Sequence, residues 1–123
     1  MRLALLPQAF SVCRLADAGQ VDLSREFVFF ARTDRELSLV CPSRWAPEGA
    51  LAREDGWRAL RVEGVLDFSL VGILAGITGA LAAAGVPVFA LSTYDTDYLL
   101  VKEDRLKAAL AALKGAGYTL LVP

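Results

Sequence analysis

The sequence predicts an α+β fold, with a ferredoxin-like βαββαβ domain over residues 57–123 and a mostly β lobe over residues 1–56. The first half holds short apolar runs separated by turn residues and shows no long helical period. The second half alternates strand-like and helix-like segments. Of the 123 residues, 55% are hydrophobic and 22% are charged, which suffices for a packed core. We therefore expect two helices to cover one face of a four-stranded antiparallel sheet in the second half.

The first half is expected to be built from strands. Residues 33–35 form a short polar stretch with the length of a hairpin connection. Pro42 ends the strand expected at residues 36–41, because proline cannot donate a hydrogen bond to the ladder. Residues 43–56 contain proline, glycine and alternating charges, which predicts a loop or one short helical turn. The strands are expected at residues 9–15, 26–32 and 36–41.

The second half is expected to contain two helices among four strands. The first helix is rich in Leu, Ile and Ala and ends at Gly85, and the second is amphipathic and ends at Gly115 and Gly117. The strands are predicted at residues 57–62, 86–93, 97–102 and 118–122, and the helices at residues 70–84 and 103–114.

A long uncharged stretch raises the question of a membrane span. No charged residue occurs between Phe68 and Tyr94, a run long enough to cross a bilayer. Residues 85–87 (Gly-Val-Pro) break the run, and acidic residues stand where a span would carry flanking Lys and Arg. The N-terminus lacks the features of a secretory leader. We therefore expect no membrane partner and a cytoplasmic protein.

Composition argues against several classes of function. Lys plus Arg is 13 and Asp plus Glu is 14, so the basic excess that nucleic-acid binding needs is missing. The absence of His removes the commonest general base and most zinc sites. Cys13 and Cys41 lie in apolar runs, which favours buried free thiols over a disulfide. We expect a non-catalytic protein that uses no cofactor and no metal.

Two polar segments are candidates for a binding site. Residues 65–73 join a strand to a helix, where unpaired backbone N–H groups suit a carboxylate or a phosphate. Asp67 or Ser69 could equally serve only as the helix cap. Residues 92–97 (STYDTD) form the densest polar cluster, which is either a self-bonded turn or a site for a cationic group. Nearby, three glycines at helical spacing favour close approach of the helix to its sheet or to another chain: Gly72, Gly76 and Gly79.

These segments carry a resemblance to a known family. Residues 63–101, EGVLDFSLVGILAGITGALAAAGVPVFALSTYDTDYLLV, resemble an ACT domain, the amino-acid-sensing module of aspartate kinases and related regulators. More narrowly, STYDTDYLLV at residues 92–101 is similar to small bacterial two-lobe ACT proteins related to the metazoan cytosolic arginine sensor. Residues 26–45, EFVFFARTDRELSLVCPSRW, resemble the N-terminal lobe of that group, an ACT-like half with its helices reduced or absent.

The resemblance implies amino-acid binding rather than catalysis. The ligand would lie where the strand–helix loop meets a neighbouring strand, at an interface between ACT units. In the arginine sensor, the acid that matches Asp97 faces the cationic side chain of the ligand. By position, the residues that the resemblance assigns to the ligand are Asp67, Phe68, Ser69, Gly72, Val88, Thr93, Tyr94 and Asp97.

The chain also departs from the arginine sensor in two respects. The sensor has glycine at the position of Asp67, and it has four ACT units where this chain has about two. A homodimer would restore the number of units. The alternative is a protein–protein interaction module with an empty or vestigial pocket. An enzyme is the weakest alternative, because Asp67 and Asp97 would have to do all acid–base work.

Overall fold

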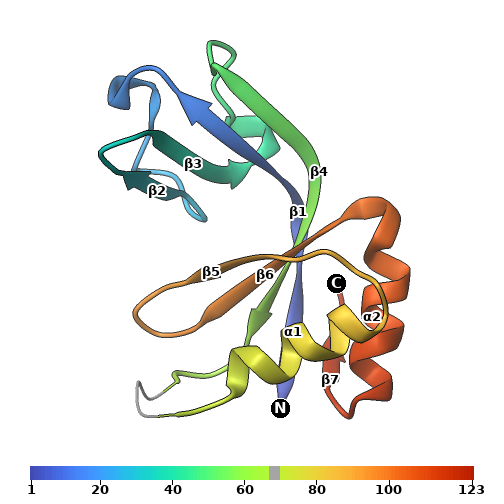
Figure 1. Ribbon diagram of the computed structural model, residues 1–123. Helices are drawn as coiled ribbons and strands as arrows, with labels where there is room; N and C mark the ends of the chain where they lie inside the picture. Colours follow the sequence, from blue (N-terminus) through green and yellow to red (C-terminus); the bar gives the residue numbers. More distant parts are fainter. Residues whose placement is uncertain (67–69) are drawn as a thin grey trace. The chain divides into compact units, whose positions relative to one another are not determined.

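The computed structural model describes residues 1–66 and 70–123, and it divides into two compact units. Unit 1 comprises Met1–Pro7 and Arg58–Pro123, and unit 2 comprises Gln8–Trp57. Strands β1 (Arg2–Leu15) and β4 (Ala52–Val62) are long enough to contribute to both. Both units contain strands, and both α-helices of the described chain belong to unit 1, which confirms the α+β class (Figure 1).

Unit 1 is a sheet with two helices packed against it. Its strands lie in the order β7-β1-β4-β6-β5, and the ends of β1 and β4 are joined by the hydrogen bond from Glu63 N to Arg2 O, 3.0 Å. The remaining elements, in chain order, are α1 (Ile73–Ala83), β5 (Phe89–Ser92), β6 (Asp97–Lys102), the 3₁₀ turn η3 (Glu103–Arg105), α2 (Leu106–Gly115) and β7 (Thr119–Leu121).

The expected four-stranded antiparallel sheet is wrong in one respect. The first residues of β1 lie between β4 and β7, and β7 pairs with β1 in parallel, with Leu3 opposite Leu120. Leu3 and Leu5 project from alternate positions of this added strand and are 0% and 9% exposed. The strand is inserted because it buries these alternating leucines in the core of unit 1, which removes their apolar surface from water. β4 also begins at Ala52, inside the segment expected to be a loop.

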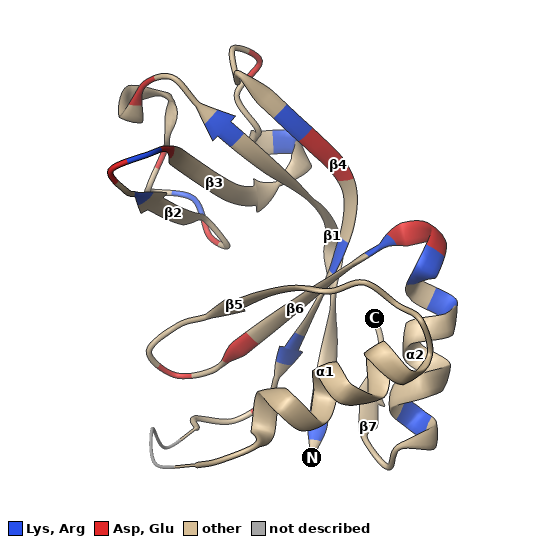
Figure 2. Cartoon of the chain, in the orientation of Figure 1, with Lys and Arg blue, Asp and Glu red and all other residues tan. Residues whose placement is uncertain are grey.

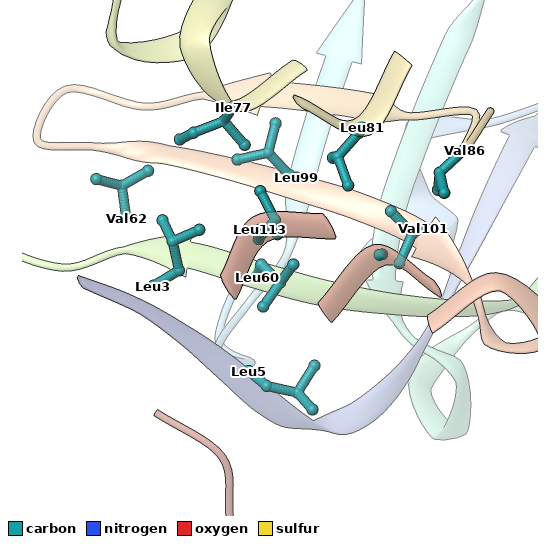
Figure 3. Close-up of a cluster of buried hydrophobic side chains, with 11 residues drawn as sticks. Leu3, Leu5, Leu60, Val62, Ile77, Leu81, Val86, Leu99, Val101 and Leu113 are labelled. Carbon is teal, nitrogen blue, oxygen red and sulfur yellow. The ribbon is translucent and has the colours of Figure 1, made fainter. Parts of the chain in front are cut away.

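The core of unit 1 is almost purely aliphatic and lies between the helices and the sheet (Figure 3). Ile77 and Leu81 from α1 and Leu113 from α2 are 0% exposed, and they face β-strand residues such as Leu60 and Leu99. Burying each such side chain contributes about 1.5–3 kcal/mol. No helix of the described chain is both long enough and apolar enough to cross a bilayer.

Both helices end as the glycines predict. Gly85 has φ 71°, and Val86 N donates to Leu81 O at 2.9 Å while Gly85 N donates to Ala82 O at 3.0 Å. This is a Schellman motif, which needs the left-handed conformation that glycine adopts at little cost. At the end of α2, Gly117 (φ 97°) closes the same pattern of hydrogen bonds.

The three glycines of the α1 segment do not share a single packing role. A Cβ on Gly76 would lie 2.9 Å from Tyr118 Oη, so close packing is confirmed there. Gly72 has φ 81° and open space around it, and Gly79 also has no heavy atom near its Cβ position within the described chain. Within the described chain, packing against a neighbour is therefore seen at Gly76 and not at Gly72 or Gly79, and an approach of another chain to these two stays a prediction.

Unit 2 is a small β structure in which the 3₁₀ turns η1 (Ala18–Gln20) and η2 (Ser43–Trp45) are its helical segments. β3 (Leu37–Pro42) pairs with β1 on one side and with β2 (Phe29–Arg32) on the other, antiparallel in both cases. Cys13 and Cys41 are free thiols. They form a compact core with Leu15 and Leu39.

The two hairpins of the chain repeat one another at an offset of 60 residues. Phe29 pairs with Val40 in the β2–β3 hairpin, and Phe89 pairs with Leu100 in the β5–β6 hairpin. Each hairpin leads into a 3₁₀ turn, η2 and η3. The repeat covers the hairpins but not the helices, since residues 8–57 contain no α-helix.

Candidate functional site

A cavity of about 320 Å³ lies in unit 1, beside the turn of the β5–β6 hairpin. One wall is the start of α1 with the segment before it, and the other wall is the hairpin turn itself. Its lining comes from residues 66, 70, 72–75 and 92–97. The volume lies at the small end of the range for ligand sites, about 300–1,000 Å³, and suits a ligand of amino-acid size.

The turn that forms one wall is tied to itself and to β4. Thr93 N donates to Thr96 O at 2.8 Å, and Thr93 Oγ1 donates to the same oxygen at 3.1 Å. Thr96, which is 8% exposed, donates its hydroxyl to Val62 O at 2.5 Å. Leu66 N donates to Asp95 O at 2.7 Å. The wall is therefore preorganised, because Thr96 is bonded to the last residue of β4 and Asp95 to the segment that follows β4.

The acidic groups of this wall make the cavity electronegative. Ser92 and Asp97 are paired across the hairpin, and Ser92 Oγ donates to Asp97 Oδ1 at 2.6 Å. This bond orients the Asp97 carboxylate, and Asp95 also lines the cavity. No Lys or Arg occurs among the described lining residues. Figure 2 shows this acidic turn and the charge-free α1. The turn is therefore suited to a cationic group.

The opposite wall offers backbone N–H groups. Gly72 is the N-cap of α1 in a left-handed conformation, φ 81° and ψ 2°, and makes no side-chain capping bond. Gly76 N donates to Gly72 O at 2.9 Å, so the first α-helical hydrogen bond begins there. Ile73, Leu74 and Ala75 lie in the first turn and line the cavity. N–H groups of a first turn lack partners within the helix, and they suit a carboxylate.

The structure brings together four of the residues singled out from the sequence. Gly72, Thr93, Tyr94 and Asp97 line this cavity, and Tyr94 is 81% exposed. Val88 is not part of the lining; it packs against the hydrophobic core of unit 1. The three others, Asp67, Phe68 and Ser69, lie outside the described residues.

The role of Ser92 was missed from the sequence. The sequence places Ser92 only in a polar cluster, whereas in the structure it positions the Asp97 carboxylate. The signal was present in the spacing: residues that flank a four-residue turn face each other across a hairpin. The apolar lining by Leu66 and Ile73 was also missed, because the same residues contact the core.

Two features of the described residues bear on catalytic chemistry: groups of metal ligands and the Cys41 thiol. No group of three or more potential metal ligands occurs among them. Burial raises the pKa of the Cys41 thiol to about 11, with a further contribution from Cys13. A thiol with such a pKa is protonated at neutral pH and is a poor nucleophile.

The chain matches the ACT domain family model over residues 52–115. It is also similar to curated vertebrate proteins named cytosolic arginine sensor for mTORC1 subunit 1. The Bos taurus protein is 39% identical over 106 residues, which cover 80% of this chain and 32% of that protein. The chain thus spans about a third of the length of this relative.

Solved structures share the whole fold. Protein Atu0741 from Agobacterium tumefaciens superposes with a TM-score of 0.87 at 31% identity, covering 99% of this chain and 92% of that one. The regulatory subunit of aspartate kinase from Thermus thermophilus superposes with a TM-score of 0.64 at 13% identity, covering 95% of this chain and 97% of that one. At that identity the second likeness concerns the fold alone.

Proposed function

The chain belongs to the ACT domain family, and from this premise we propose that it is a non-catalytic regulatory protein that binds an amino acid beside the β5–β6 hairpin. The observation that carries the proposal is the polarity of the cavity. One wall presents the Asp97 carboxylate and the other presents the first-turn N–H groups of α1. This arrangement complements a molecule that carries an ammonium group at one end and a carboxylate at the other.

Asp97 is the residue that we propose to face the cationic group of the ligand. Its carboxylate is partly buried and already oriented by Ser92, so little conformational entropy is lost when a ligand binds. We assign the ligand carboxylate to the start of α1 at Gly72. Thr93 and Tyr94 complete the site at the turn. The predicted contributions of Asp67, Phe68, Ser69 and Val88 remain part of the proposal.

We further propose that residues 1–56 form an ACT-like lobe with its helices reduced and that residues 57–123 form an ACT domain, whose sheet also takes in the first residues of β1. The 60-residue repeat of hairpin and 3₁₀ turn supports this division. The proposed functional form is a cytoplasmic homodimer in which ACT units meet near the ligand. Its support is the exposed apolar surface beside the cavity, where Leu70 is 52% and Val71 is 92% exposed.

The experiment is a thermal-shift screen of the purified protein against the twenty amino acids, followed by calorimetric titration of each amino acid that responds. A ligand at one hundred times its Kd stabilises the folded state by about 2.7 kcal/mol, which raises the melting temperature. Asp97→Asn should weaken binding about tenfold or more, because it removes a charged partner. The matched control is Asp34→Asn in the equivalent turn of the β2–β3 hairpin, which should bind as the wild type does.

A screen without any response would contradict the amino-acid proposal. The alternative, an interaction module with a vestigial pocket, is favoured by the uncharged and exposed surface of α1, where Ala75, Gly79 and Ala82 face solvent. The two functions are distinguished by the same variant. Under the alternative, Asp97→Asn has no effect on partner binding, whereas a charge placed at Ala82 abolishes it.

A further inference from the structure

Unit 2 contains a cavity of its own, which the β5–β6 site does not use. Its volume is about 290 Å³. It lies between β1, the loop before β2, and η2. Its lining includes Gln8, Arg25, Glu26, Phe27, Arg44 and Trp45. All of them belong to unit 2, so the cavity is complete within that unit.

Two guanidinium groups gather at one indole ring. Arg25 Cζ lies 3.8 Å from the centroid of the Trp45 ring, and Arg44 Cζ lies 5.5 Å from it. Arg25 is also held by an ion pair of its Nε with Asp22 Oδ2, at 3.3 Å. Trp45 is nevertheless 40% exposed. The exposed indole offers an apolar surface, and the two guanidinium groups beside it offer N–H donors that can bind an anion.

Gln8 supplies an unpartnered acceptor in the same lining. Its Oε1 is buried and has no hydrogen-bond partner within the described chain. A buried polar atom without a partner lowers stability, and such atoms are rare in native proteins. A ligand N–H group would satisfy this oxygen. The Glu26 carboxylate, which lines the same cavity, favours the same kind of donor.

The backbone beside the cavity is held in a costly conformation. Phe27 has φ 60°, and it is the non-glycine residue with positive φ in the described chain. Its ring is fixed edge-on against the buried Phe10, with centroids 6.3 Å apart. Strained residues of this kind concentrate at ligand-binding sites, where packing keeps them in place.

We propose that unit 2 binds a small carboxylate that bears an N–H group, of the size of an amino acid or an N-acylated amino acid. Arg44 and Arg25 hold the carboxylate, Gln8 Oε1 accepts the N–H, and the Trp45 indole covers the apolar part of the ligand. The site is separate from the cavity beside the β5–β6 hairpin and does not depend on it, because the two share no residue.

The test follows the indole N–H signals of the ¹⁵N-labelled full chain by NMR. The chain has 2 tryptophans, and Trp45→Phe assigns the two signals. N-acetylglycine is the probe, acetate is the comparison that lacks the N–H group, and inorganic phosphate is the comparison anion. We expect N-acetylglycine to shift the Trp45 signal in a saturable manner and to leave that of Trp57 in place. Acetate should bind more weakly.

Matched variants assign the effect to named groups. Arg44→Gln, at an exposed position, should weaken N-acetylglycine binding about tenfold or more. Gln8→Met should weaken it and remove the difference between N-acetylglycine and acetate. Asp97→Asn, in the cavity beside the β5–β6 hairpin, should leave the N-acetylglycine titration unchanged. The test of the unit 2 site is therefore independent of the test of the proposed amino-acid site.

Three results would overturn the proposal. The first is the absence of a saturable shift of the Trp45 signal with N-acetylglycine. The second is an Arg44→Gln protein that titrates as the wild type does. The third is a shift with phosphate and none with N-acetylglycine, which would show a site for a bare anion instead. Because Arg44 is exposed, its variant tests the site even if Gln8→Met does not fold.

Discussion

The β2–β3 and β5–β6 hairpins have the same backbone and different chemistry. In both, a threonine opens the turn: Thr33 N donates to Glu36 O at 3.0 Å, and Thr93 N donates to Thr96 O at 2.8 Å. The Oγ1 of Thr33 also contacts that same carbonyl oxygen, at 3.4 Å, as the Oγ1 of Thr93 does in its own turn. A threonine that bonds its own turn is sufficient to set this geometry locally.

The side chains around the two turns differ in almost every respect that bears on binding. The positions of Ser92 and Asp97 are occupied by Arg32 and Leu37 in the other hairpin. A cavity of about 490 Å³ beside the β2–β3 turn is lined by three arginines, whereas the β5–β6 cavity has none in its described lining. The comparison teaches that the turn is a shared scaffold and that its flanking residues decide what it can bind.

The largest expected difference concerns the core that supports each hairpin. Leu81 on α1 is 0% exposed in the large aliphatic core of unit 1, and Leu39 on β3 is 2% exposed in the four-residue core of unit 2. Leu81→Ala should lower the free energy of unfolding by about 3–5 kcal/mol. Leu39→Ala should lower the free energy of unfolding less, by about 2–3 kcal/mol. The smaller core around Leu39 can relax further into the cavity that the substitution leaves. Urea unfolding of both variants measures this, and an equal or larger loss for Leu39→Ala would contradict it.

The second difference is a dependence on alkaline pH that arises from the Cys41 thiol of unit 2. Burial raises the pKa of the Cys41 thiol to about 11 from 9.0, so the folded state binds more protons than the unfolded state between these values. The stabilisation is complete below pH 9 and is lost as the pH rises towards 11, with a change of roughly 2 kcal/mol.

The measurement is urea unfolding of the wild type and of Cys41→Ala between pH 8 and 11. The slope of the free energy of unfolding against pH should be shallower in Cys41→Ala. This holds for any loss of stability that the substitution causes at pH 8. The control is Leu100→Ala in the β5–β6 hairpin, beside the position that corresponds to Cys41. This variant should keep the wild-type slope of stability against pH. Parallel slopes for all three proteins would show that the thiol does not contribute.

The third difference is the hydrogen bond that anchors the β5–β6 turn to β4. Thr96→Val removes the hydroxyl that donates to Val62 O and should cost about 1–2 kcal/mol, because a buried carbonyl oxygen loses its partner. Its counterpart Glu36 is exposed, and Glu36→Val should change stability by no more than about 0.5 kcal/mol. Thermal unfolding of the two variants compares them directly. Equal losses would mean that the two turns are anchored alike.

The smallest effect concerns α1, the element that one hairpin has and the other lacks. Gly79 lies inside the helix with open space at its Cβ position, so Gly79→Ala should raise stability by about 0.5–1 kcal/mol. Gly76→Ala is the matched variant and should gain less, since its Cβ would lie 2.9 Å from Tyr118 Oη. Thermal unfolding checks the order of the two. A loss of stability in Gly79→Ala would show that another part of the protein covers this face.

Much of the local structure was determined by the sequence itself. The hairpin turns, the Schellman glycine at Gly85 and the helix periods arise from interactions within a few residues, so they were predicted close to their observed positions. The polar cluster pointed to Thr93, Tyr94 and Asp97, the family resemblance added Gly72, and the structure places all four in the lining of one cavity. Each belongs to a short polar or glycine-containing segment between apolar ones.

Only the tertiary structure decided the remaining features, because they depend on contacts between distant segments. The pairing of residues 2–4 with β7 brings together segments from the two ends of the sequence. The different surroundings of Gly76 and Gly79 follow from where Tyr118 packs. The cavity at Trp45 in unit 2 brings together Gln8 and Trp45 from separate segments. Local periodicity carries no information about such pairings, since burial and register are set by the partner that each face meets.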